Sequence, residues 1–406
     1  MLSDELSLIG RYFVDGRLTG SAELTAAARS RLMAAAGEYC SAIGWPELGA
    51  HFGADALLFA DDDALRYRAH AVSGLAHAIN GEYVSAETHL GQAHALFSRS
   101  RWPEEETDYL TLLTRTLLAP ARMDPGDLAD VASTLERAQP DNRYWAYTAR
   151  AARVMQGLLE GDYSAAFAAG NALCEGLERR RSHRMVRGFV LCIRADILVA
   201  CGEHEAALAS LAGARTHPGH AICFHMQRSA ALLHLGRERE LLTETEACVS
   251  AEPEHCMRTL VPVKLRRALA HARLRDPHRA EQSMTVVLTM IANTGGSVAP
   301  FIMLPRDEVR ALLGTIAASH PHLIDTIGRI LRLTGGITTT PPAFDRLTPA
   351  QQAIAALLAE GHSSAEIARR KNISVNTLKT HIRLIYRKLG VSNRAEAVAI
   401  LLAGGV

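Results

Sequence analysis

Lysine is scarce in this sequence: the 406 residues contain four, Lys264, Lys371, Lys379 and Lys388. None of them completes the pattern G-x-x-x-x-G-K-S/T, so the sequence excludes a phosphate-binding loop of the standard ATPase type. Aromatic residues make up 5% of the chain, whereas alanine, leucine and arginine are abundant, a composition that favours helix. No run of alternating β-branched residues predicts a sheet, and the doubly wound α/β pattern of a phosphorylation receiver is missing.

Long hydrophobic runs are also missing. No stretch of about eighteen uncharged apolar residues is present, so we expect no membrane span. The first residues show no basic region followed by an apolar core, so we expect no signal peptide. The seven cysteines are scattered and odd in number, which indicates reduced, buried thiols in a cytoplasmic protein.

Catalytic constellations are not found either. No Ser-His-Asp or paired-carboxylate arrangement can be argued, so we predict no enzyme, no catalytic residue and no cofactor. One stretch is rich in possible metal ligands and is followed later by His255 and Cys256; its residues are His217, His220, Cys223 and His225. Such residues can bind zinc or haem, but their spacing matches no closed zinc pattern, and a histidine-containing loop before a helix is the simpler interpretation. We assign no metal ligand and leave the question open.

An internal repeat spans roughly residues 60–300. In its two complete copies a glycine is followed, at the same offsets, by alanine, leucine and alanine: Gly81 with Ala86, Leu90 and Ala93, and Gly202 with Ala207, Leu211 and Ala214. Weaker copies begin at Gly161, Gly236 and Arg275, and Pro125 starts a further turn. The pattern predicts stacked antiparallel helix pairs, because glycine permits a tight turn and alanine permits close helix approach.

This array resembles the tetratricopeptide repeat family in a degenerate form, and the alternative is a helical bundle with coincidental spacing. The resemblance implies a concave face that binds a peptide, a protein segment or a small ligand. We predict an all-α chain with a helical-repeat region at 1–334, a linker at 335–344 and a compact domain at 345–406. The linker is predicted from its glycines, threonines and Pro-Pro pair, which cannot continue a helix.

The charge of the chain is divided between these regions. The whole sequence has a net charge of +1, but from residue 343 onward nine Lys and Arg face four Asp and Glu. The preceding residues carry a small negative net charge. Three of the four lysines lie in the C-terminal block, so the basic character is concentrated where an anionic partner would bind.

The C-terminal block has the pattern of a helix-turn-helix. Thr348, either Ser363 or Ser364, and Ser374 are expected to begin three helices, and Gly361 and Asn372 to end the first two. The third helix has a buried stripe, Leu378, Ile382, Ile385 and Leu389, and an opposite polar face, Asn376, Lys379, Thr380, Arg383 and Arg387. A fourth helix is expected from Asn393. A polar, basic second helix of such a motif reads the major groove of DNA.

The block resembles the LuxR-type domain, also called NarL/FixJ or GerE-type. The resemblance implies that the third helix recognises DNA and that the fourth supports dimerisation. It implies a DNA-contacting set of Ser374, Asn376, Thr377, Lys379, Thr380, Arg383, Arg387 and Lys388, and a dimerisation set of Ala395, Val398, Ala399 and Leu402. The sequence departs from the family pattern at Ala350-Gln351, where Arg-Glu is usual, at Lys371, where a buried leucine is usual, and at Leu378, where valine is usual.

We therefore predict a nucleoid-associated transcriptional regulator that binds double-stranded promoter DNA as a homodimer, with RNA polymerase as a further candidate partner. A small molecule, peptide or protein on the helical array would control it. The alternative interpretation is a protein-docking scaffold with weak or vestigial DNA binding. Whether the full chain binds DNA separates the two.

Overall fold

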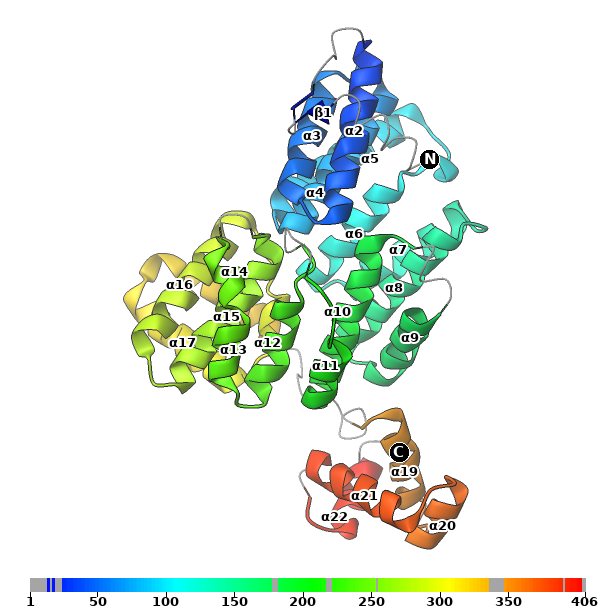
Figure 1. The fold of residues 1–406 in the computed structure, drawn as a ribbon, viewed down its shortest axis with the longest axis vertical. Coiled ribbons are helices and arrows are strands. Elements are labelled where there is room, and N and C mark those ends of the chain that lie inside the picture. Colours follow the sequence, from blue (N-terminus) through cyan, green and yellow to red (C-terminus); the bar gives the residue numbers. More distant parts are fainter. Residues whose placement is uncertain are drawn as a thin grey trace.

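The computed structural model consists almost entirely of α-helices (Figure 1). It describes residues 13–14, 17–18, 24–176, 182–216, 221–252, 255–335, 347–389 and 391–403. Within these ranges the strands are β1 (Phe13–Val14) and β2 (Arg17–Leu18), which pair antiparallel with Phe13 opposite Leu18. The predicted all-α fold is confirmed. None of the described helices combines the length and apolar character needed to cross a membrane.

The N-terminal half of the helical array is a series of antiparallel neighbours. Side chains that accept from the first turn begin several of them: Thr25 accepts from Ala28, and Asp62 from Leu65. The helices are α2 (Ala26–Ile43), α3 (Pro46–Leu58), α4 (Asp63–Asn80), α5 (Tyr83–Ser100), η2 (Glu104–Glu106), α6 (Tyr109–Arg122), α7 (Pro125–Ala138), α8 (Arg143–Glu160) and α9 (Tyr163–Glu175).

The second half of the array continues the series, and its residues 224–335 form the lobe drawn in light green to yellow in Figure 1. Its core is a separate cluster that includes Leu232, Leu269, Met284 and Leu313. The helices are α10 (Arg184–Ala200), α11 (His204–Ser210), α12 (Phe224–His234), α13 (Glu238–Glu244), α14 (Glu246–Ser250), α15 (Met257–Arg273), α16 (Pro277–Thr294), η5 (Ala299–Phe301), α17 (Arg306–Ser319), η6 (Pro321–Leu323) and α18 (Ile324–Gly335).

The predicted helix pairs are present. Five of the predicted turn residues have a left-handed backbone between two helices, with φ of 94° at Gly81, 84° at Gly161, 76° at Gly202, 70° at Gly236 and 62° at Arg275. In the first pair Ala86 and Ala93 are fully buried. A Cβ added at Gly74 would lie 3.5 Å from the Cβ of His89, so α4 and α5 are in contact there. The tetratricopeptide assignment itself stays a prediction.

The array curls back on itself. The start of α15 packs against the end of α4, where the Sγ of Cys256 donates to the carbonyl of Ile79 at 2.7 Å and the Nε of Arg258 donates to the same oxygen at 3.2 Å. A Cβ at Gly81 would lie 2.7 Å from the backbone nitrogen of Arg258, so no larger residue fits. This contact joins the first helix pair to a helix about 180 residues later and encloses a central space.

The C-terminal unit has a core of its own, which includes Leu347, Ile354, Leu358, Ile367, Leu378, Ile385 and Leu401. Its helices are α19 (Pro349–Ala359), α20 (Ser364–Arg370), α21 (Val375–Leu389) and α22 (Arg394–Ala403). The predicted linker begins at Gly335, the last residue of α18, and its residues 336–344 lie outside the described residues. The domain boundaries at 334 and 345 stay predictions.

Candidate nucleic-acid interface

The beginnings of α19 and α20 are fixed by reciprocal capping boxes. Thr348 accepts from the backbone of Gln351, whose side chain accepts from the backbone of Thr348; Ser363 and Glu366 repeat this arrangement. The same hydrogen bonds lower the pKa of the Glu366 carboxyl, with those from the Ser363 side chain and backbone as the main causes. Both N-caps agree with the sequence-based prediction.

The turn between α20 and α21 is set by Asn372 and Ser374. Asn372 has a φ of 53°, the left-handed conformation expected of it, and Gly361 has a φ of 87° after α19. The Oγ of Ser374 accepts from the backbone nitrogen of Thr377 at 3.0 Å and thus begins α21. Lys371 is exposed at the end of α20, where its ammonium reaches solvent.

Helix α21 separates apolar from polar residues. Leu378, Ile385 and Leu389 are buried in the domain core and Ile382 is half-buried, as the predicted stripe requires. The predicted DNA-contacting residues Ser374, Asn376, Thr377, Lys379, Thr380, Arg383 and Arg387 are all exposed. Lys379 and Arg383 make no ion pair within the described part of the chain. The geometry is that of a helix-turn-helix with an unobstructed cationic second helix.

Residues 345–401 match the family model described as "Bacterial regulatory proteins, luxR family". This segment is a luxR-family domain. It is 48% identical over 57 residues to the probable transcriptional regulatory protein SgaR of Hyphomicrobium methylovorum, which is 14% of this chain and 27% of SgaR. The chain is also 40% identical over 73 residues to the putative HTH-type transcriptional regulator YhjB of Escherichia coli, which is 17% of this chain and 36% of YhjB.

A match of the luxR-family domain to the HTH-type transcriptional regulator MalT of Yersinia pestis covers 52 residues at 42% identity, 13% of this chain and 6% of MalT. The chain thus spans roughly a third or less of these relatives. These three matches cover 13–17% of this chain.

The luxR-family domain contacts the helical array through the side chains of Lys388 and Gln352. The ammonium of Lys388 donates to Glu203, which precedes α11, and to the Oε1 of Gln351 at 3.0 Å. The Oγ of Ser164 in α9 donates to the Oε1 of Gln352 at 2.8 Å. The side chain of Lys388 is 8% exposed. Among the described residues, Lys388 is therefore the predicted DNA contact that instead binds a residue of the helical array. Gln351 makes this polar contact at the position where the family usually has Glu.

The predicted dimerisation residues lie on α22. Its inner face is Ala397 and Leu401, which are fully buried in the domain core. Ala395 is exposed and Val398 is half-buried, whereas the side chains of Ala399 and Leu402 lie outside the described residues. Arg394 anchors the start of α22 by donating to the carbonyl of His362 at 2.6 Å.

Two residues of the histidine-rich stretch, Cys223 and His225, are among those that the structure describes. His217 and His220 lie outside the described residues. The Nδ1 of His225 is 2.8 Å from a carboxylate oxygen of Glu244, so it forms an ion pair when protonated. Cys223 instead faces Cys248, a residue that the sequence did not single out because it lies 25 positions away with no short-range pattern.

The helical array is hollowed by an open cavity of about 750 Å³. Its walls are largely apolar and come from α6, α8, α10, α12, α15 and η5; they include Leu117, Met155, Leu158, Phe189, Ile193, Ile222, Met226, Pro262, Ile302 and Met303. The sequence predicted a concave binding face but not these residues, because the curl of the array brings them together from positions 83–303.

A few polar groups converge on the cavity. Asp196 accepts from the Nε2 of Gln227 at 3.1 Å, and burial raises the pKa of its carboxyl to about 6 against the attraction of Arg266. Arg266 is 4% exposed and donates to the carbonyl of Met226, and burial lowers its pKa. The Oε1 of Gln227 and the Nε of Arg266 are buried without a hydrogen-bond partner among the described residues. A buried polar atom without a hydrogen bond lowers the free energy of unfolding, unless a ligand or a water molecule forms the bond.

Proposed function

We propose that this protein is a DNA-binding transcriptional regulator. The observation that carries the proposal is the exposed cationic face of α21 on a luxR-family helix-turn-helix. Lys379 and Arg383 lie where donors can reach guanine edges or phosphates, and the buried stripe behind them fixes the helix orientation. The relatives SgaR, YhjB and MalT are named as transcriptional regulators, which supports the same role here.

The direct test is genome-wide mapping of bound DNA, followed by binding of the full chain to a mapped site in purified form. Sequence-specific binding at promoters is the expected result. A full chain that binds every duplex equally, or none, contradicts the proposal and supports the docking-scaffold interpretation. Binding is measured across salt concentrations, because phosphate contacts alone give non-specific, salt-dependent affinity.

We further propose that two copies bind adjacent half-sites and pair through the outer side of α22. Ala395 is exposed there and Val398 is half-buried, so both are available to a second domain. Closed two-fold pairing would make the bound sites roughly palindromic.

We propose that a small molecule bound in the central cavity regulates DNA binding. A volume of about 750 Å³ falls within the range typical of small-ligand sites, and mostly apolar walls with a few polar groups are also typical. The ligand would be a largely apolar molecule with one polar group, able to donate to Gln227 and accept from Arg266. It must bind the DNA-competent and incompetent states with different affinities, since otherwise it shifts nothing.

The dye 1-anilinonaphthalene-8-sulfonate, which is apolar with one anionic group, is a suitable probe for the cavity. We expect one dye per chain and loss of binding in Leu158→Trp, which fills the cavity. The matched control Leu58→Trp adds the same bulk at a side chain that is 79% exposed. Equal dye binding by both variants contradicts the cavity as the ligand site, while leaving DNA binding untouched.

A further inference from the structure

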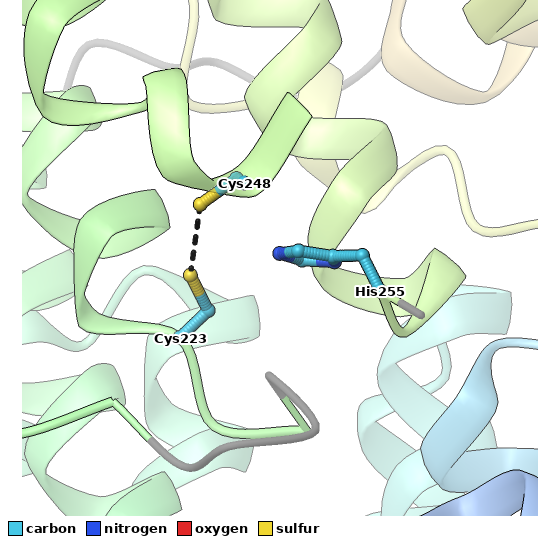
Figure 2. A group of neighbouring side chains, drawn as sticks. All are labelled: Cys223, Cys248 and His255. Atoms are coloured by element: carbon cyan, nitrogen blue, oxygen red, sulfur yellow. Dashed lines mark hydrogen bonds between the residues drawn. The ribbon is translucent and has the colours of Figure 1, made fainter. Parts of the chain in front are cut away.

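Three buried side chains with metal-binding atoms converge at one point beside the cavity (Figure 2). Cys223, Cys248 and His255 are exposed by 1%, 0% and 4%, respectively. Their ligand atoms all lie within 4.8 Å of one another, and the two sulfurs are 3.6 Å apart. Figure 2 shows the imidazole edge of His255 directed at the two sulfurs.

Each side chain is held by a different element. Cys223 is the N-cap of α12, and its sulfur accepts from the backbone nitrogen of Met226 at 3.3 Å. Cys248 lies in the short helix α14, and His255 lies just before α15. A thiolate at a helix N-terminus is stabilised by the backbone donors and the helix dipole, so Cys223 is placed to act as an anionic ligand.

The tautomer of His255 suits metal binding. Its Nδ1 lies 3.0 Å from the carbonyl of Cys256, and a carbonyl only accepts, so Nδ1 carries the hydrogen. Nε2 then bears a lone pair, and it is the nitrogen farther from the backbone, at the end that faces the sulfurs in Figure 2. A backbone carbonyl on the remote nitrogen is the usual outer hydrogen bond of a metal-ligating histidine.

The spacing of the sulfurs distinguishes a metal site from a disulfide. A disulfide requires about 2.05 Å between sulfurs, far less than is observed. Zinc with Zn–S bonds of about 2.3 Å and tetrahedral angles places two thiolates about 3.8 Å apart. The observed separation of 3.6 Å is close to this value, so the two sulfurs need little movement to share one ion.

The charge balance also favours a divalent ion. A Zn²⁺ ion displaces the two thiol protons, and two thiolates with a neutral imidazole leave the site without net charge. A buried site can hold such an ion without the large cost of an uncompensated charge.

We propose that Cys223, Cys248 and His255 bind one Zn²⁺ ion, with the fourth tetrahedral position left for water or an exogenous donor. The ion ties the start of α12, α14 and the start of α15 together. Cys223 and Thr259 also line the cavity, so the bound ion fixes the shape of one cavity wall. The proposal does not depend on the cavity's ligand or on DNA binding.

The test is metal content of the purified full chain after incubation with Zn²⁺ and removal of the excess. We expect one Zn²⁺ per chain, release of about two protons per ion near neutral pH, and loss of the ion in Cys248→Ser and His255→Gln. With Co²⁺ in place of Zn²⁺, an intense sulfur-to-cobalt charge-transfer band should appear in the wild type. Cys40→Ser and Cys174→Ser, half-buried cysteines outside the cluster, should keep both signals.

Far-ultraviolet circular dichroism of Cys248→Ser and His255→Gln should match that of the wild type, which separates loss of a ligand from loss of fold. Melting curves of all variants with and without Zn²⁺ give a second readout, because the ion should stabilise only the chains that bind it. A reduced wild-type chain that binds no Zn²⁺ overturns the proposal, as does full Zn²⁺ content in a folded Cys248→Ser chain.

Discussion

Lys388, near the end of α21, donates its ammonium to the carboxylate of Glu203, which lies 185 positions earlier at the start of α11. The pair joins the luxR-family domain to the helical array while the exposed face of α21 remains open. An ammonium that is paired with a carboxylate binds a phosphate more weakly. We therefore expect that Lys388 can contact DNA only after its ion pair with Glu203 opens. The array can thus weaken DNA binding without covering the recognition residues.

Glu203→Gln should strengthen binding of the full chain to a mapped promoter by about 0.5–1 kcal/mol, about two- to fivefold, because it releases Lys388 for a phosphate. Affinity is measured by fluorescence anisotropy at several salt concentrations. Glu205→Gln is the control and should have no effect, because the native Glu205 side chain, two residues along the chain, is 72% exposed. Lys388→Ala should weaken binding to all sequences about equally and lower the salt slope by about 1. If Glu203→Gln still strengthens binding in a Lys388→Ala background, the ion pair is not the cause.

Lys379→Ala and Arg383→Ala should each weaken specific binding by about 1–3 kcal/mol where the side chain contacts a base. Preference at the contacted base pair should relax, which binding to a panel of single-base variants measures. Arg310→Ala removes one positive charge from α17, far along the chain at a side chain that is 69% exposed, and serves as the control. Wild-type affinity and selectivity in both α21 variants would refute the recognition assignment.

Ala395→Asp should abolish cooperative binding to a two-half-site DNA, because two-fold pairing through α22 would bring two added carboxylates together. Ala395 is exposed, so the domain core that contains Ala397 and Leu401 should stay intact. Native mass measurement of the complex checks this: two wild-type chains per DNA, one for the variant. A wild-type complex with a single chain on a palindromic site would show that α22 does not pair.

His183 should make the stability of the array dependent on pH. It is 7% exposed, and its Nδ1 accepts from the backbone nitrogen of Met185 at 3.2 Å. Burial, helped by Arg187, lowers the pKa of His183 from 6.5 to about 4. A lowered pKa means that the folded state resists protonation, so this stability is present above pH 6.5 and lost as pH falls from there through 4.

Protonation linked to His183 should lower the free energy of unfolding by up to about 3 kcal/mol once the pH has fallen to about 4. His183→Asn keeps an acceptor for Met185 but does not titrate, so its urea-unfolding free energy should fall less steeply over this window. His51→Asn, at a side chain that is 69% exposed, is the control and should follow the wild type. Parallel pH curves for His183→Asn and the wild type would contradict the prediction.

Local features of this chain were predictable because short-range rules decide them. The stripe Leu378, Ile385 and Leu389 follows from helical period, and the turn at Asn372 follows from its tolerance of a left-handed backbone. The partner of Lys388 was not predictable, because nothing near Lys388 in sequence refers to Glu203. The same holds for Cys248, which meets Cys223 only when α12 and α14 are packed. The sequence thus predicted the residues of the helix-turn-helix, and the curl of the array determined the cavity and the thiol pair.

The contact between Gly81 and Arg258 changes how the helical array is expected to unfold. An open solenoid couples each repeat only to its neighbours, so it frays from its ends and tolerates the deletion of a terminal unit. Here α4 and α15 are joined, and the helices between them form a closed hoop. A hoop has no free end within that span, so we expect removal of any helix pair between α4 and α15 to disturb the contact between α4 and α15 as well as the helices on either side of the deletion.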